Sequence, residues 1–279
     1  MSGPPLLEVE DLNVSFPGRG GTTLAVRNAS FTLGRERLGI VGESGSGKST
    51  TGRALLGLIA PPGIVSAKRL TLAGQDLRTL KDSDWQLLRG RRMSMVMQDP
   101  KYSLNPVIKV GHQIQETYRL HHRASAAEAR KRAIAMLEAV RIRDPDLVYH
   151  LYPHQLSGGM GQRAMIAMML IAEPDLLIAD EPTSALDVTV QNQVLRILDD
   201  LVSDRGMGLI FISHNLTIVS SFCDRVLVMY GGKIVEECKA SELHAAKHPY
   251  TRALIQAAPS LTHPKAELST VIRDPAWLA

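Results

Sequence analysis

The chain has 279 residues, of which 44% are hydrophobic and 22% are charged, so we expect a folded globular protein and not a disordered one. The net charge is only +4, with 32 basic and 28 acidic residues interspersed, which is weak evidence for nucleic-acid binding and is explained better by a solvated face and a phosphate-binding site. The longest apolar run, 164–172, is far shorter than the roughly 18 residues of a membrane span, so no bilayer crossing is predicted.

The N-terminal ten residues lack the basic region and the apolar run of a secretion signal, and we expect no leader segment. Residues 6–16 and 22–33 alternate in polarity around a Pro/Gly-rich turn at 17–21, which predicts two antiparallel strands. Phe16 ends the first strand, where its ring could stack on an adenine. Covering a small core is an equally good interpretation of that ring.

Residues 40–50 read Ile-Val-Gly-Glu-Ser-Gly-Ser-Gly-Lys-Ser-Thr and fit the Walker A pattern G-x-x-x-x-G-K-[ST]. An apolar run at 38–41 predicts a strand before this loop, and residues 51–58 predict a helix after it. The glycines let backbone N–H groups face a phosphate at a helix start, where the helix dipole favours anions. We expect Lys48 to reach the β- and γ-phosphates and Ser49 to bind Mg²⁺.

Further elements follow in order. The pattern predicts a β-rich segment at 63–77, a short helix at 84–89, a strand at 93–96 directly before Gln98, and a helical region at 110–169. Its clearest helix is 126–140, where Ser125 can cap the N-terminus and Glu128 lies in the capping-box position.

Two buried strands are predicted at 176–181 and 209–212, and each ends in polar residues. Asp180 has the Walker B arrangement, in which a carboxylate holds Mg²⁺ through its water shell, and Glu181 is placed to polarise an attacking water. Because α/β sheets bind ligands at the carboxyl ends of their strands, we expect Asp180, Glu181, His214 and Gln98 to converge at the edge that carries the phosphate loop.

The C-terminal part contains a hairpin at 225–229 and 233–237 and a helix at 249–258. Beyond Pro259 the composition is polar, and we expect poor packing there. Two cysteines, Cys223 and Cys238, lack metal-ligand spacing, and we interpret them as small hydrophobic side chains.

The segment Leu156-Ser157-Gly158-Gly159-Met160, followed by Gln162-Arg163, resembles the signature motif of ABC ATPases. At a helix start it exposes N–H groups and a hydroxyl, a second cradle for an anion. The resemblance covers nearly the whole chain, because the other family motifs stand in the family's order. They are Walker A, Gln98 as Q-loop, the signature, Walker B, Ser184-Ala185-Leu186-Asp187 as D-loop and His214 as H-loop, with Phe16 at the place of the A-loop aromatic.

Within the family, three features resemble the peptide/nickel/opine importer branch. One is the segment from Gln98-Asp99-Pro100 to Leu104-Asn105-Pro106. Met160 replaces the commoner glutamine of the signature, and the tail contains His248-Pro249-Tyr250-Thr251-Arg252-Ala253-Leu254. Longer members carry a cysteine-containing region associated with an iron–sulfur cluster. No cysteine follows Cys238 here, so no cluster is inferred.

The resemblance implies an α/β fold: a P-loop NTPase (RecA-like) core, an N-terminal antiparallel β-subdomain and an inserted α-helical signature subdomain. We expect the core at 1–98 and 171–240, the helical subdomain at 99–170 and a family tail at 241–279. By resemblance, the catalytic residues are Glu181, His214, Gln98 and Lys48. The nucleotide-binding residues are Phe16, Gly42, Ser44, Gly45, Gly47, Lys48, Ser49, Thr50, Ser157, Gly158, Gly159 and Asp187, and the magnesium ligands are Ser49, Gln98 and Asp180.

The implied function is ATP binding and hydrolysis, with Mg²⁺, that powers uptake of peptides or related small solutes such as nickel or opines. The implied partners are a second ATPase subunit, identical or homologous, packed head to tail, two transmembrane permeases and, indirectly, a periplasmic or extracellular solute-binding protein. No nucleic acid is expected. The implied location is the cytoplasmic face of the bacterial inner membrane, as a peripheral subunit, with the region after Gln98 as the docking surface.

Two other functions fit parts of the pattern. A soluble ABC ATPase of DNA repair or translation would use the same chemistry, but such proteins usually carry long coiled coils or two cassettes, and this sequence shows neither. A P-loop kinase or GTPase switch leaves the signature and the strand before His214 unexplained. The solute itself is not encoded here, because a binding protein and the membrane subunits select it.

Overall fold

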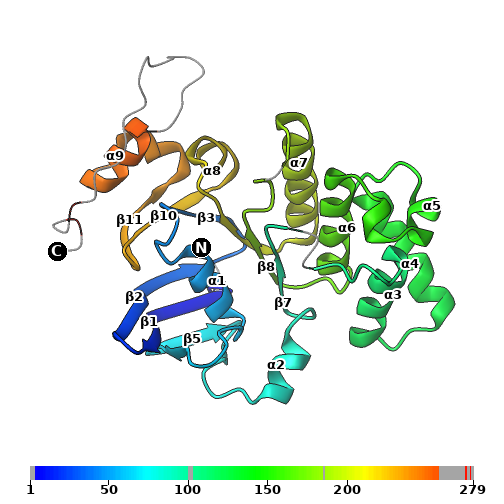
Figure 1. The fold of residues 1–279 in the computed structure, drawn as a ribbon, viewed down its shortest axis with the longest axis horizontal. Coiled ribbons are helices and arrows are strands. Elements are labelled where there is room, and N and C mark those ends of the chain that lie inside the picture. The colour runs from blue at the N-terminus through cyan, green and yellow to red at the C-terminus, as the bar shows by residue number, and fades with distance from the viewer. Residues whose placement is uncertain (1–3, 100–102, 185, 258–273, 275–276, 278–279) are drawn as a thin grey trace. The chain divides into compact units, whose positions relative to one another are not determined.

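The structure is a computed structural model that describes residues 4–99, 103–184 and 186–257 together with Asp274 and Trp277. The chain forms two compact units (Figure 1). The first takes residues 1–80 and 208–279, and the second takes residues 81–207. The division expected from the sequence, into a core, a helical subdomain and a tail, places its boundaries elsewhere and stays a prediction.

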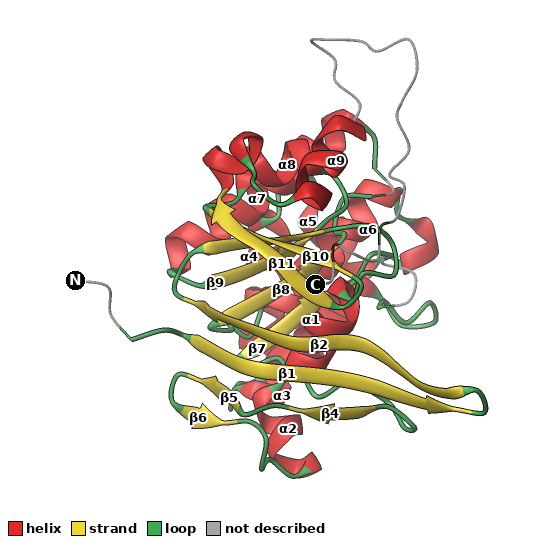
Figure 2. Ribbon diagram, turned by 90° about the vertical axis from the view of Figure 1, so that its left-hand side faces the viewer, coloured by secondary structure: helices red, strands yellow, loops and turns green. Residues whose placement is uncertain are grey.

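The first unit begins with an antiparallel sheet built on two long strands, β1 (Leu7–Gly18) and β2 (Gly21–Leu33), which Figure 2 shows side by side. Buried residues alternate with half-buried or exposed ones along much of both strands, as a sheet with one covered face requires. The turn is tighter than expected, because Pro17 pairs with Thr22 and Gly18 with Gly21. The same sheet contains β4 (Ile64–Ser66), β5 (Arg69–Leu72) and β6 (Gln75–Asp76).

The first unit also contains a group of mostly parallel strands. Strand β3 (Arg37–Val41) lies between β9 (Gly208–Ile212) and β10 (Arg225–Tyr230), and β11 (Lys233–Lys239) pairs antiparallel with β10. Nearly every residue of β3, β9 and β10 is buried, as expected for parallel strands covered on both faces. The helical elements of this unit are α1 (Lys48–Leu55), α8 (Leu216–Phe222), the 3-10 helix η3 (Ala240–Ala245) and α9 (Pro249–Ala257).

Helix α8 packs closely on β3. A Cβ atom on Gly39 would lie 2.4 Å from Cγ1 of Val219, so the strand needs glycine at this contact. Cys223 lies beside the same glycine, and burial raises the pKa of its thiol to about 12. The expectation that this cysteine acts as a small hydrophobic residue fits its buried, protonated state.

The second unit combines two parallel strands, β7 (Met93–Val96) and β8 (Leu176–Asp180), with helices. These are α2 (Asp82–Leu88), α3 (Val110–His121), α4 (Ala126–Ala139), α5 (Pro145–His150), the 3-10 helix η2 (Pro153–Gln155), α6 (Gly158–Leu170) and α7 (Val188–Arg205). The predicted cap of α4 is confirmed, since the Ser125 hydroxyl accepts a hydrogen bond from the N–H of Glu128 at 3.2 Å.

Within the part of the chain that the structure describes, no helix has both the length and the apolar character needed to cross a bilayer. The poor packing expected beyond Pro259 falls almost entirely outside the described residues. Trp277, which is described, contacts the rings of Tyr230 and Tyr250 with centroid distances of 5.5 Å to each.

Candidate functional site

The phosphate loop leaves β3 at Val41 and enters α1 at Lys48. Gly47 caps the helix with φ of +101°, and a Cβ there would lie 2.4 Å from the carbonyl oxygen of Ala25 in β2. Gly42 has φ of +150°, and a Cβ there would lie 2.2 Å from the carbonyl oxygen of Met229 in β10. Backbone from two strands therefore encloses the loop at both of its ends, and only glycine fits at either position.

The Lys48 side chain is 5% exposed and points back into the loop. Its Nζ donates to the carbonyl oxygens of Gly42 and Glu43, both at 2.8 Å. Ser44 and Gly45 are exposed at the tip of the loop, whereas Ser49 and Thr50 are half-buried in the first turn of α1. The loop thus has a fixed ammonium group, a helix N-terminus and an open tip, which is the chemistry of an anion site.

His214 follows β9 in the same unit. Ile212 pairs with Ile40 in the parallel sheet, and the N–H of Ser213 donates to the carbonyl oxygen of Ile40 at 3.1 Å. His214 and the phosphate loop therefore emerge from the same carboxyl edge of the sheet. The His214 side chain is exposed.

Phe16 is half-buried on β1. A Cβ added to Gly63 would lie 2.8 Å from Cε1 of the Phe16 ring, so the ring packs beside that glycine. Part of the ring is exposed and part is packed, which agrees with both interpretations of this residue, and its contact with an adenine stays a prediction.

The second unit brings three predicted residues together at the ends of β7 and β8. Val96 pairs with Ala179, so Gln98 and Glu181 lie two residues beyond paired positions of adjacent parallel strands. Asp180 ends β8 and is 6% exposed. Glu181 is half-buried and has φ of +49°, a left-handed backbone that is uncommon for a residue with a side chain. Asp180 and Glu181 therefore lie at the carboxyl end of this strand pair.

The signature residues lie at another place in the same unit, at the start of α6. The Ser157 hydroxyl accepts from the N–H of Met160 at 3.4 Å, and Asp187 caps α7 by accepting from the N–H of Val190 at 3.0 Å. A Cβ on Gly159 would lie 2.6 Å from Cγ1 of Val190, so the N-termini of the two helices are neighbours. Ser157, Gly158 and Asp187 are exposed. An anion that approached from outside would meet the positive ends of both helix dipoles.

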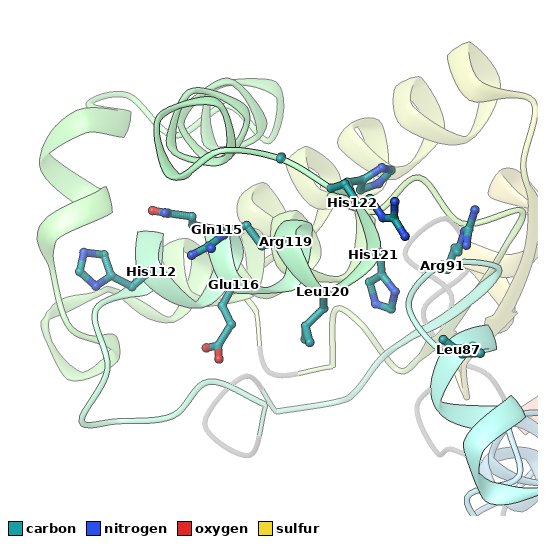
Figure 3. A pocket seen from close by; sticks show the side chains of 11 residues that line it. Leu87, Arg91, His112, Gln115, Glu116, Arg119, Leu120, His121 and His122 are labelled. Atoms are coloured by element: carbon teal, nitrogen blue, oxygen red, sulfur yellow. The ribbon is translucent and has the colours of Figure 1, made fainter.

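A groove of about 950 Å³ lies along α3 in the second unit. Figure 3 shows Leu120 and His121 on α3, with Leu87 and Arg91 across the groove. The groove holds exposed apolar side chains, since Leu87 is 69% and Leu120 is 75% exposed. Burial, followed by the charges of His122 and Arg91, lowers the pKa of His121, which favours the neutral imidazole.

No group of three or more His, Cys, Asp or Glu side chains that could hold a metal ion occurs among the residues that the structure describes.

One contact at the phosphate loop could not be predicted from the sequence. The N–H of Glu43 donates to the hydroxyl of Tyr250 at 2.9 Å, across a separation of 207 residues. The motif around Tyr250 was visible in the sequence, but only as a family hallmark.

The model of the ABC transporter family matches residues 26–184. The oligopeptide transport ATP-binding protein OppD of Salmonella typhimurium is 45% identical over 272 residues, which make up 97% of this chain and 81% of that protein. The dipeptide transport ATP-binding protein DppD of Escherichia coli is 44% identical over 268 residues, which make up 95% of this chain and 82% of that protein.

Two solved structures have the same fold. The protein cbiO1 of Clostridium perfringens, part of the ABC transporter complex cbiONQ, has a TM-score of 0.74 and 27% identity, covering 87% of this chain and 92% of its own. The ATP-binding cassette MJ0796, dimeric and bound to ADP and Pi, has a TM-score of 0.75 and 24% identity, covering 84% of this chain and 98% of its own. Because the family model covers more than half of the sequence and the relatives match nearly all of it, the chain belongs to the ABC transporter family.

Proposed function

We propose that the chain is the ATP-binding and ATP-hydrolysing subunit of an importer of peptides or related small solutes. The observation that carries the ATP-binding part is the enclosed phosphate loop, with the Lys48 ammonium held at its centre. The importer part is supported by relatives named for oligopeptide and dipeptide transport. Nickel and opines, the other solutes that the sequence resemblance implies, are included in the proposal.

In this proposal, Lys48 and the loop amides bind the β- and γ-phosphates, and Phe16 stacks on the adenine. Thr50 lies with Ser49 at the helix start, where the amides point toward the phosphates. Glu181 accepts a proton from the attacking water, while His214 positions that water and the γ-phosphate. The assembly of these groups around one nucleotide is part of the proposal.

The proposed metal is Mg²⁺, held by Ser49, Gln98 and Asp180. Their hydroxyl, amide carbonyl and carboxylate oxygens are the hard donors that Mg²⁺ prefers, and few protein ligands suffice because waters and phosphate oxygens complete its shell. When bound, the ion would neutralise charge on the phosphates.

A second ATPase subunit, identical or homologous, would complete the site. Ser157, Gly158 and Gly159 offer a hydroxyl and helix amides at an exposed helix start, and Asp187 lies beside them. These groups suit the γ-phosphate of a nucleotide that a partner holds. ATP would then close a head-to-tail dimer, and hydrolysis would open it.

Ser157→Arg tests this arrangement. The arginine should block ATP-driven dimerisation, while the affinity of the isolated chain for ATP should stay within about twofold, since this residue would serve the partner's nucleotide. Size-exclusion chromatography with ATP gives the first quantity and a fluorescent ATP analogue the second. Loss of ATP binding by the isolated chain would show that Ser157 acts on its own subunit's nucleotide.

The groove along α3 is the proposed docking surface for the transmembrane permeases. Apolar Leu87 and Leu120 lie among basic side chains, a surface that suits a short segment with apolar and acidic residues. We infer that this segment belongs to a permease, which would place the chain at the cytoplasmic face of the bacterial inner membrane. A periplasmic or extracellular solute-binding protein would act on the permeases and not on this chain.

Leu120→Glu should weaken assembly with the permeases at least tenfold, because it places a carboxylate where apolar area is buried. Leu147→Glu is the matched control, since Leu147 is 61% exposed in the same unit but does not line the groove. Co-purification in mild detergent measures assembly, and the affinity for ATP should not change in either variant. Equal co-purification of both variants would place the docking surface elsewhere.

The same co-purification separates the proposal from a soluble ABC ATPase of DNA repair or translation. Recovery of integral membrane proteins with the unmodified chain supports the importer. Recovery of ribosomes or DNA instead would favour the alternative, which no relative reported above supports.

A further inference from the structure

The C-terminal helix α9 contacts the phosphate loop through Tyr250. This residue is fully buried, and its hydroxyl accepts a 2.9 Å hydrogen bond from the N–H of Glu43, the second residue of the Walker A pattern. We propose that Tyr250 is a positioning residue that holds the start of the phosphate loop in its nucleotide-binding conformation. This inference rests on the proposed binding of ATP and adds a contribution from the tail of the chain.

The geometry concerns one peptide group, the one between Gly42 and Glu43. Its carbonyl oxygen accepts from Nζ of Lys48 at 2.8 Å, and its N–H donates to Tyr250. Gly42 has φ of +150° and no side chain, so its backbone is free to rotate in principle, and these two hydrogen bonds help to fix this peptide. When Lys48 turns to a phosphate, its hydrogen bond to the carbonyl is lost, and the Tyr250 hydroxyl keeps the peptide in place.

Tyr250 can act in this way because its own position is fixed. Its ring lies 4.4 Å from that of Tyr230 and 5.5 Å from that of Trp277, measured between centroids. Its N–H donates to Nδ1 of His248 at 3.2 Å. A carboxylate oxygen of Glu236 on β11 accepts from the N–H of His248 at 3.3 Å, which ties the start of α9 to the sheet. These contacts hold the Tyr250 side chain in place, so its hydroxyl meets the phosphate loop at a fixed position.

Tyr250→Phe removes the hydroxyl and keeps the ring. We expect the KM for ATP of the assembled transporter, and the Kd of the full chain for a fluorescent ATP analogue, to rise about three- to tenfold, the usual effect of one lost hydrogen bond. The kcat at saturating ATP should stay within about twofold, because the hydroxyl touches no reacting atom. Tyr230→Phe is the control, because it keeps the ring beside Tyr250 and removes a hydroxyl that donates to the carbonyl oxygen of Asp274 and not to the loop. The KM and the Kd of this variant should stay within about twofold of the unmodified values.

Amide hydrogen exchange gives a second measurement that does not depend on activity. In the unmodified chain without nucleotide, the Glu43 amide should exchange much more slowly than the amide of exposed Ser44, and Tyr250→Phe should remove this protection while exchange in β3 stays slow. Fast exchange at Glu43 in the unmodified chain would overturn the proposal, and so would unchanged nucleotide affinity in Tyr250→Phe. Lys48→Ala identifies which proposal has failed. If Lys48→Ala and Tyr250→Phe both bind ATP normally, the phosphate-loop assignment is wrong. If Tyr250→Phe binds ATP normally and Lys48→Ala does not, the proposed role of Tyr250 is wrong.

Discussion

Glu181→Gln is expected to lower ATP hydrolysis at least about a hundredfold, because it keeps the size of the side chain and removes the carboxylate that would accept a proton from water. General-base assistance is typically worth about 10²- to 10⁴-fold in rate. The affinity for ATP should change only a few-fold, since the phosphate loop and Asp180 are intact. The ATP-bound dimer should therefore accumulate, and size-exclusion chromatography should show it as a long-lived species.

A matched control for this variant exists in the same unit. Glu173 also has a left-handed backbone, with φ of +57°, but it is exposed and lies before β8. Glu173→Gln makes the same chemical change on the same kind of backbone and should leave turnover unchanged. Near-normal hydrolysis by Glu181→Gln would falsify its role as the base, and another group would then have to activate the water.

Lys48→Ala is expected to reduce ATP affinity about 10- to 100-fold, since a hydrogen bond to a charged group is worth about 1.5–3 kcal/mol. Hydrolysis should fall to background, because the same ammonium would neutralise charge that develops on the phosphates. Isothermal titration and phosphate release measure the two effects. They test different claims, since the first concerns binding and the second concerns chemistry.

The control for Lys48→Ala is Lys239→Ala, which removes an exposed lysine of β11 that forms a surface ion pair with Glu242. Such pairs contribute little to stability, so both measurements should match the unmodified chain. Lys48 also donates hydrogen bonds to two loop carbonyl oxygens, and Lys48→Ala removes both. The melting temperature of this variant should therefore be measured as well, to separate a loss of folding from a loss of ATP binding. Normal turnover by Lys48→Ala in the assembled complex would rule out the phosphate-loop assignment.

Most elements could be predicted from local patterns. The strand at 93–96 and the Ser125 cap agree with the structure, because apolar runs and capping residues act over a few positions. The helix expected at 51–58 begins earlier, at Lys48, since the left-handed Gly47 ends the loop and starts the helix at once. Such a boundary depends on a backbone angle that composition does not encode.

Contacts between distant segments could not be predicted. The enclosure of Gly42 by the carbonyl oxygen of Met229, and the bond from Glu43 to Tyr250, join residues that only the completed fold brings together. The individual motifs were visible because phosphate chemistry restricts residue type and spacing. The surroundings of each motif depend on tertiary packing, and a single sequence gives no information on which distant residues pair.

The left-handed backbone of Glu181 has a consequence for directed evolution of this chain. Glycine adopts this φ freely, whereas a glutamate there destabilises the fold, by about 1–2 kcal/mol for a residue in the left-handed helical conformation. A library screened only for resistance to heat should therefore enrich glycine or asparagine at position 181. A library screened for growth on an imported solute should keep the acid. The two screens would therefore select different residues at position 181, and thermostable variants of this subunit should be sought with Glu181 kept unchanged.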